Sequence, residues 1–166
     1  MKLQTLKKTW VMFRVNHLLA GTRCFEKKRR LLCSVGHEIG EGTRVVGPLI
    51  CTGQLKIGRD CWVGRDLTVT GNGTVEIGDC CDVAPGVMFV TGSHVIGDAQ
   101  RRAGKGNNRN IRVGSGCWLG ARATVLGGAA LGDGTVVAAC ACVTKDMPGN
   151  CLIGGVPARI IRELEP

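Results

Sequence analysis

The sequence predicts an all-β fold in which short strands and tight turns repeat at a fixed interval. Three observations indicate it: apolar residues recur at every sixth position, glycine accounts for 26 of 166 residues, and aromatic residues make up only 4%, with no tyrosine. The length fits one domain, and a hydrophobic share of 44% is too high for a disordered chain. The core is therefore expected to consist of small and medium-sized side chains.

The six-residue period follows two series of apolar positions, with a shift of two residues where they meet. The first series runs from Ile39 to Val75. The position after each apolar residue is usually Gly or Ala and the fifth position is small, which predicts that the first and fifth positions face the interior. The second series is apolar throughout and consists of Ile77, Val83, Phe89, Val95, Val113, Leu119, Val125, Leu131, Val137 and Val143.

The ten cysteines are expected to be reduced thiols, and not disulfides or metal ligands. No CxxC pair occurs in the sequence, and neither of the two close cysteine pairs has the spacing of two ligands to one tetrahedral metal. Reduced thiols favour a cytoplasmic location. Four cysteines occupy inward positions of the repeat, and we interpret them as core fillers: Cys51, Cys61, Cys81 and Cys117.

Residues 2–20 are predicted to form a basic amphipathic helix. Residues 1–30 hold nine Lys and Arg side chains and one acid, Glu26, so that +8 of the formal net charge of +9 lies there. Two interpretations stay open: the helix covers the first coil, or it makes a peripheral contact with an anionic membrane surface. No apolar stretch is long enough to cross a bilayer, and no stacking aromatics or binding motif indicate a nucleic-acid partner.

The repeat is interrupted once, between Val95 and Val113. Residues 97–110 are polar and glycine-rich, with four basic residues and one acidic residue, so we expect this segment to leave the core as a loop. Long loops on a rigid scaffold often carry function. The predicted organisation is a basic helical cap over 1–36, a repeat domain over 37–156 that includes the loop, and a C-terminal cap over 157–166.

Five sequence blocks within residues 75–162 resemble the hexapeptide-repeat acyltransferases, in particular their galactoside/maltose O-acetyltransferase branch. The blocks are APGV at 84–87, TGSH at 91–94, CWLG at 117–120, VTKD at 143–146 and GVPAR at 155–159. The resemblance implies a left-handed parallel β-helix of triangular section with three hexads in each coil. It also implies a homotrimer with active sites between subunits, and acetyl-CoA as co-substrate without a metal.

His94 is the candidate catalytic residue. An imidazole with an ordinary pKa of about 6.5 can accept a proton at neutral pH, and His94 directly precedes the predicted loop. The resemblance assigns it the role of the general base that deprotonates the acceptor hydroxyl as this attacks the thioester. For the oxyanion, Ser93 and a glycine amide stay open as donors.

The resemblance also names cofactor-binding residues. It implies that Trp118 lines the pantetheine arm of CoA, with core packing as the alternative for this ring. It further implies backbone contacts at Ala121 and Ala139. The residues expected near the nucleotide end, where cations suit the phosphates, are Thr144, Lys145, Arg159 and Arg162.

The acceptor is expected to be a sugar hydroxyl, as in capsule or exopolysaccharide synthesis. Gly64 stands where the family usually has an Asn, with Asp66 two residues later, and Asn72 stands where an Asp is common in the family. Asp66 and Asn72 are therefore the candidate acceptor-binding residues, and Cys140 replaces a Gly that the resemblance leads us to expect. Serine and antibiotic hydroxyls are the alternative acceptors, and a non-catalytic scaffold is the alternative of another class. A carbonic anhydrase of the same fold is disfavoured because it needs three histidines and the central coils contain only His94.

Overall fold

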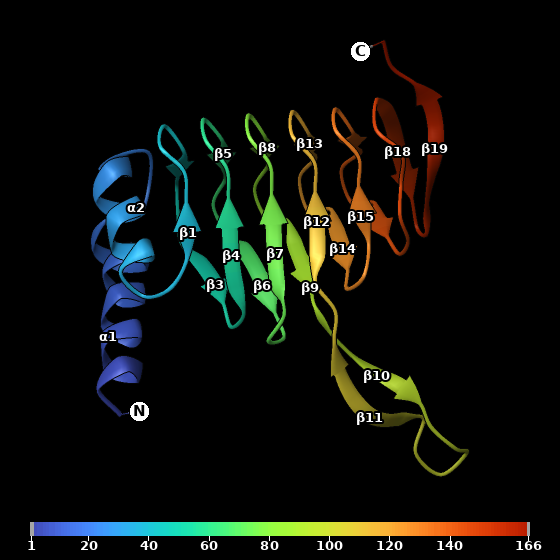
Figure 1. Cartoon of the computed structure of the whole chain (residues 1–166), viewed down its shortest axis with the longest axis horizontal. Coiled ribbons are helices and arrows are strands. Elements are labelled where there is room, and N and C mark those ends of the chain that lie inside the picture. Colours follow the sequence, from blue (N-terminus) through green and yellow to red (C-terminus); the bar gives the residue numbers. More distant parts are fainter. Residues whose placement is uncertain (1, 166) are drawn as a thin grey trace.

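The computed structural model describes residues 2–165 and shows a straight stack of coils with helices at one end (Figure 1). Met1, Pro166 and the side chains of Lys2 and Leu3, which we assigned to the caps, lie outside the described residues. Each full coil contributes one short strand to each of three sheets, named A, B and C in chain order, whose strands run parallel except for the last strand of sheet B. The sheets form the three sides of a prism. The predicted all-β fold, a parallel β-helix, is therefore confirmed.

Sheet A consists of β1 (Glu38–Ile39), β4 (Gln54–Ile57), β7 (Thr74–Ile77), β12 (Ile111–Val113) and β15 (Ala130–Leu131). Sheet B consists of β2 (Arg44–Val45), β5 (Trp62–Val63), β8 (Asp82–Val83), β13 (Trp118–Leu119), β16 (Val136–Val137), β18 (Cys151–Gly155) and β19 (Ala158–Glu163). Sheet C consists of β3 (Leu49–Cys51), β6 (Leu67–Thr70), β9 (Met88–Val90), β14 (Thr124–Leu126) and β17 (Cys142–Val143).

The register between coils explains the six-residue period and its shift. Ile39 pairs with Ile57, 18 residues later, whereas Ile57 pairs with Ile77, 20 residues later. The second coil therefore contains two extra residues, which produce the shift between the two apolar series. The predicted inward cysteines are all buried in the core, as are nine of the ten apolar residues of the second series. Those nine are Ile77, Val83, Phe89, Val113, Leu119, Val125, Leu131, Val137 and Val143.

Glycine is required where a turn presses against the next coil. A Cβ added to Gly114 would lie 2.6 Å from the backbone nitrogen of Asp133, and one added to Gly120 would lie 2.6 Å from the backbone nitrogen of Ala139. No side chain fits at such a distance, because the coils stack at the spacing of paired strands. The glycine after the apolar residue in many hexads therefore allows the coils to approach one another.

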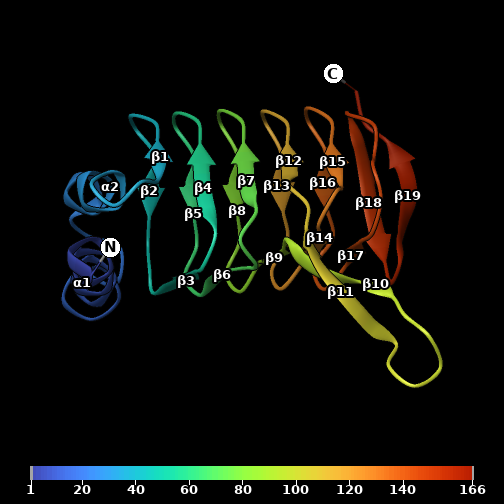
Figure 2. The ribbon, with the colours of Figure 1, turned by 60° about the horizontal axis from the view of Figure 1, so that its bottom comes forward.

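Val95 is the exception to the period, and its predicted inward position is wrong. The segment that leaves the prism is an antiparallel hairpin of β10 (Gly92–Ile96) and β11 (Ala103–Asn108), so it begins five residues before the loop expected at 97–110. Strand β10 pairs with β11 and not with the coils on either side, which leaves Val95 outside the core and 54% exposed. Figures 1 and 2 show the hairpin projecting from the prism.

Two helices, and not one, cover the first coil. They are α1 (Lys2–Phe13), which continues into a π-helical turn η1 (Arg14–Leu18), and α2 (Phe25–Cys33). Val11, Val15 and Leu32 join the core of the prism. Lys28 is fully buried, and its Nζ donates to the carbonyl oxygens of Gly21 at 2.7 Å and Val46 at 2.8 Å. The helices therefore protect the exposed strand edges of the first coil.

The other end of the prism is covered by β18 and β19, which pair antiparallel at the edge of sheet B. Figure 2 shows this hairpin beyond the last full coil. Within residues 2–165, no helix is long and apolar enough to span a membrane.

Candidate active site

His94 lies on the hairpin, opposite Gly106, with its side chain exposed. Its Nδ1 is 2.8 Å from the carbonyl oxygen of Gly104. Because a carbonyl oxygen can only accept a hydrogen bond, the neutral ring must carry its proton on Nδ1. The lone pair on Nε2 is then available to accept a proton from another molecule. The hydrogen bond would also stabilise the imidazolium that forms when this happens.

The root of the hairpin is tied to the preceding coil by asparagine side chains. Asn108 Oδ1 accepts a hydrogen bond from the backbone N–H of Asn72 at 2.7 Å, and Asn110 Oδ1 accepts one from Thr74 at 2.9 Å. The backbone N–H of Arg109 donates to the Thr91 carbonyl at 2.8 Å. These bonds fix the direction in which the hairpin leaves the prism. Sequence reasoning missed both asparagines, although their position just before the repeat resumes was a usable signal.

The two predicted acceptor-binding residues lie apart within one subunit. Asn72 is at the root of the hairpin, where it contacts Asn108. Asp66 is at the opposite end of β6, and its carboxylate is 3.1 Å from the Nε of Arg65. One copy of the chain therefore does not bring Asp66 and Asn72 together.

Trp118 lies on the outer face of sheet B, between Asp82 and Val136 in register. The ring is not part of the core, because the residue is 57% exposed. Core packing, the alternative for this residue, is thus excluded. An exposed indole offers a flat apolar surface on which a ligand can lie.

Ala121 and Ala139 lie beside each other in exposed turns that follow β13 and β16. The carbonyl oxygen of Ala121 accepts a hydrogen bond from the backbone N–H of Cys140 at 2.9 Å. Cys140 has a φ of +59°, a conformation that favours glycine, which explains why a Gly is expected there. The structure accommodates the cysteine with its side chain exposed.

Lys145 and Arg159 line the same open groove, of about 310 Å³, together with Asp146 and Ile160. Thr144 is exposed next to Lys145 in the chain. Arg162 is exposed on β19, opposite Leu152, and does not line this groove. Two of the four residues expected near the nucleotide end therefore meet in one depression, where their positive charges could contact phosphates.

The predicted base and the predicted cofactor residues lie on different edges of the prism. The hairpin leaves between β9 of sheet C and β12 of sheet A, whereas Ala121 and Ala139 lie in turns between sheets B and C. Figures 1 and 2 show the hairpin projecting away from the body of its own subunit. His94 is therefore not directed at the Ala121 and Ala139 turns of the same chain.

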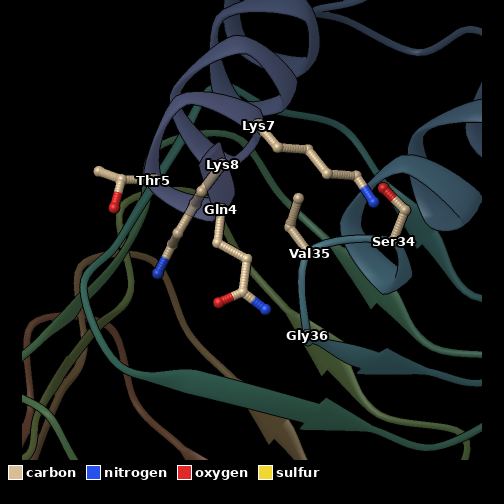
Figure 3. Close-up of a pocket in the computed structure, with 7 residues that line it drawn as sticks. All are labelled: Gln4, Thr5, Lys7, Lys8, Ser34, Val35 and Gly36. Carbon is tan, nitrogen blue, oxygen red and sulfur yellow. The ribbon is translucent and has the colours of Figure 1, made fainter. Parts of the chain in front are cut away.

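A separate pocket lies in the helical cap, between α1 and the end of α2 (Figure 3). It has a volume of about 410 Å³ and contains none of the predicted site residues. Its lining residues are Gln4, Thr5, Lys7, Lys8, Ser34, Val35 and Gly36. Across residues 2–165, no three His, Cys, Asp or Glu side chains gather in an arrangement that could hold a metal ion.

Comparison with known proteins identifies the family. Residues 110–145 match the family model of the bacterial transferase hexapeptide (six repeats). The chain is 32% identical over 141 residues to the galactoside O-acetyltransferase of Escherichia coli K12, an alignment that covers 84% of this chain and 70% of that protein. The protein belongs to the hexapeptide-repeat acetyltransferases.

Two further members of this acetyltransferase family extend the comparison. The putative colanic acid biosynthesis acetyltransferase WcaF of Escherichia coli K12 is 36% identical over 110 residues, which cover 66% of this chain and 59% of that protein. The solved structure of a galactoside acetyltransferase in complex with coenzyme A superposes with a TM-score of 0.85 at 29% identity, over 99% of this chain and 82% of that one. The predicted left-handed parallel β-helix and the predicted enzyme class, an acetyltransferase, are confirmed.

Proposed function

We propose that this acetyltransferase transfers the acetyl group of acetyl-CoA to a sugar hydroxyl, with His94 as the general base. The observation that carries the proposal is the hydrogen bond from His94 Nδ1 to the Gly104 carbonyl, which leaves Nε2 free on an exposed hairpin. The CoA complex of a structural relative supports the choice of co-substrate. The galactoside and colanic acid enzymes among the relatives support a saccharide acceptor.

In the proposed reaction, His94 Nε2 removes the proton of the acceptor hydroxyl as its oxygen attacks the thioester carbonyl carbon. The tetrahedral intermediate then collapses, the carbon–sulfur bond breaks, and the imidazolium returns the proton to the leaving thiolate. A thioester is already activated, so the protein needs only to hold the two substrates together and move one proton. Cations at Lys145 and Arg159 would hold the phosphates of CoA, and the exposed Trp118 ring would contact its pantetheine arm.

A homotrimer with shared sites forms part of the proposal. The outer face of sheet A is charged, with Lys56 Nζ 3.2 Å from Glu38 and Arg112 Nε 3.5 Å from Glu76. The outer face of sheet C is uncharged and suits burial against a neighbour. Because the hairpin leaves at the edge of sheet C, packing on this face would carry His94 toward another subunit. The residues that follow one another across sheet C are Ile50, Thr68, Met88, Thr124 and Cys142.

A cytoplasmic location and a role in capsule or exopolysaccharide synthesis complete the proposal. All ten cysteines are free, which suits a reducing compartment. Acetylation of a sugar unit before its export would require the enzyme on the side of the membrane where acetyl-CoA is made.

The activity is tested with purified protein, acetyl-CoA and a panel of acceptors. We expect release of CoA thiol with galactosides or nucleotide-linked sugars, and a product that gains one acetyl group by mass spectrometry. Acetyl-CoA at saturating concentration should also raise the melting temperature. Turnover with serine or an aminoglycoside hydroxyl, and not with any sugar, would contradict the proposed acceptor. No thermal shift and no thiol release with any acceptor would contradict the proposed reaction.

Shared sites are tested by mixing two variants with impaired activity. His94→Ala lacks the base, and a Trp118→Ala, Arg159→Ala double variant lacks cofactor contacts. If base and cofactor residues come from different subunits, co-assembled trimers should regain activity at about a quarter of their sites by random assortment. Failure of co-assembled trimers to regain activity would show that each site is built from one chain.

A further inference from the structure

Helix α1 carries apolar side chains on two opposite sides. Val11 and Val15 face the prism and are buried. Leu6, Trp10 and Phe13 are spaced by four and three residues, which places them on one stripe of the helix. At 100° per residue this stripe lies on the side of α1 away from Val11, and Val15 in the π-helical turn η1 is buried as well. The stripe faces away from the prism, and we call it the outer stripe.

The outer stripe is strongly exposed. The exposed fractions are 67% for Leu6, 58% for Trp10 and 51% for Phe13, and Leu18 in the following turn is 56% exposed. Single exposed apolar residues are ordinary, but several large ones in a row mark an interaction surface. The cap covers the first coil without them, so the contacts within this chain do not account for the stripe.

Cations lie along the side of the outer stripe. The Arg14 guanidinium is 4.5 Å from the centre of the Trp10 ring. Arg14, Lys27 and Arg30 line an open groove of about 390 Å³ between η1 and α2. The acid in this groove, Glu26, is paired with Arg29 at 2.8 Å and Arg30 at 2.7 Å. The hydrogen bonds from Arg29 and Arg30 lower the pKa of Glu26 to about 2, so it stays ionised and paired while Arg14 and Lys27 stay available.

We propose that the outer stripe and its flanking cations bind an anionic membrane surface. In this arrangement Leu6, Trp10 and Phe13 enter the boundary between headgroups and acyl chains. The cations contact the lipid phosphates. This inference concerns where the enzyme works and goes beyond the proposed acetyl transfer.

The positive charge of the cap distinguishes between two candidate partners for the outer stripe, a membrane and a second copy of the chain. Residues 1–30 carry +8, whereas the other 136 residues carry a net charge of only +1. A second cap would repel this one, and the prism of another copy offers no compensating negative field. An anionic bilayer supplies both partners that the cap needs, negative charge for the cations and an apolar layer for the stripe.

The orientation of α1 suits this role. The helix lies across the end of the prism, as Figures 1 and 2 show, and not along its side. With the outer stripe on a membrane, the helix would lie in the plane of the surface, as interfacial helices do. The prism would then stand away from the bilayer, with the hairpin clear of it.

The proposal is tested by sedimentation of the full-length protein with vesicles. Vesicles of phosphatidylcholine with about one third phosphatidylglycerol should bind the protein, and vesicles of phosphatidylcholine alone should not. Binding should weaken as salt is raised. Lipids brominated near the headgroup should quench the fluorescence of Trp10, a signal that is lost in Trp10→Phe. None of these measurements requires acetyl-CoA, so they stand independently of the proposed reaction.

Two sets of variants separate the apolar and the charged contributions. Replacing Leu6, Trp10 and Phe13 by Ser should lower vesicle binding roughly 100-fold. Arg14→Gln with Lys27→Gln should lower it about fivefold for each charge removed. The matched control is Val156→Ser with Ile161→Ser, which removes side chains that are 75% and 60% exposed at the other end of the prism and should leave binding unchanged.

Several outcomes would overturn the proposal. Equal binding to neutral and anionic vesicles would contradict the role of the cations, and an unchanged affinity of the triple Ser variant would contradict the role of the stripe. Absence of vesicle binding by the native chain, together with a smaller assembly for the triple Ser variant in light scattering, would assign the stripe to a contact between copies. The melting temperature of each variant is measured to confirm that it folds.

Discussion

The prism and the hairpin β10–β11 differ in what holds their side chains in place. In the prism, large apolar residues such as Phe89 are fully buried and each coil is bonded to the next. On the hairpin, the side chains from Ser93 to Ile96 are exposed, and His94 is oriented by one backbone carbonyl. The difference teaches that packing determines the fold of this enzyme, whereas its proposed chemistry depends on a segment that leaves the packing.

The largest effect is expected from removal of the proposed base. His94→Ala should lower kcat by roughly 10²- to 10⁴-fold, because the variant lacks the imidazole that is proposed to accept the hydroxyl proton. The melting temperature should not change, since the side chain is exposed. His17→Ala, which removes another exposed imidazole in the helical cap, is the control and should keep full turnover. Full turnover of His94→Ala would contradict the proposed mechanism.

A substitution in the prism should have the opposite result. Phe89→Ala should lower the free energy of unfolding by about 3–5 kcal/mol, because it leaves a cavity in a packed core. Val95 occupies the same phase of the six-residue period but is 54% exposed. Val95→Ala should therefore change the free energy of unfolding by no more than about 0.5 kcal/mol. Chemical denaturation measures both values, and similar losses for the two variants would contradict the structure of the hairpin.

Loosening the root of the hairpin should affect turnover more than cofactor binding. Asn108→Ala removes the acceptor for the Asn72 N–H, so the hairpin should hold His94 less firmly. We expect kcat to fall roughly tenfold with the KM for acetyl-CoA unchanged. Steady-state kinetics at varied acetyl-CoA separates the two constants, and a change confined to KM would argue against positioning through the root.

The two C-terminal arginines should differ in their effect on cofactor affinity. Arg159 lines the groove with Lys145, whereas Arg162 does not. Arg159→Ala should raise the KM for acetyl-CoA about fivefold through loss of one charge-assisted contact, and Arg162→Ala should raise it less. A larger rise in KM for Arg162→Ala than for Arg159→Ala would indicate that the nucleotide end of the cofactor binds nearer the end of β19.

A smaller effect on stability than that of Phe89→Ala is expected from a buried histidine directly before β1. His37 is buried and its Nε2 has no hydrogen-bond partner, and burial lowers its pKa. Below about pH 6.5 the unfolded chain binds a proton at this residue more readily than the folded chain, so stability should fall as the pH drops below 6.5, by at most about 1.4 kcal/mol per pH unit. Denaturation between pH 5 and 7 should show a shallower dependence for His37→Gln.

The sequence predicted the interior of the prism because its packing repeats. One large residue and one small residue fill each layer, so spacing alone identified buried residues such as Phe89 and Cys81. The same spacing failed at Val95 because it does not record which strand a residue pairs with. The N-terminal segment was predicted as one helix, and the burial of Lys28 against two carbonyl groups depends on a second helix that the charge pattern did not reveal.

The sequence predicted which residues belong to the candidate site, but not how they are arranged in space. The sequence blocks singled out His94, Trp118 and Lys145, and the structure leaves each of them exposed. The sequence could not show that Asp66 and Asn72 lie at opposite ends of β6, because the distance between two side chains depends on how the chain winds through the coil. The Gly104 carbonyl that orients His94 is a backbone group, and no residue pattern identifies its role.

The stack of coils also fixes the distance between the helical cap and the root of the hairpin. Three coils, from β1 to β9, separate the helical cap from the root of the hairpin. At about 4.8 Å per coil, they span roughly 10–15 Å. If the cap binds a membrane, the number of coils sets the distance between the lipid surface and the hairpin, so that hydroxyls held at that distance are acetylated. Insertion of one further coil would increase this distance by a single strand spacing.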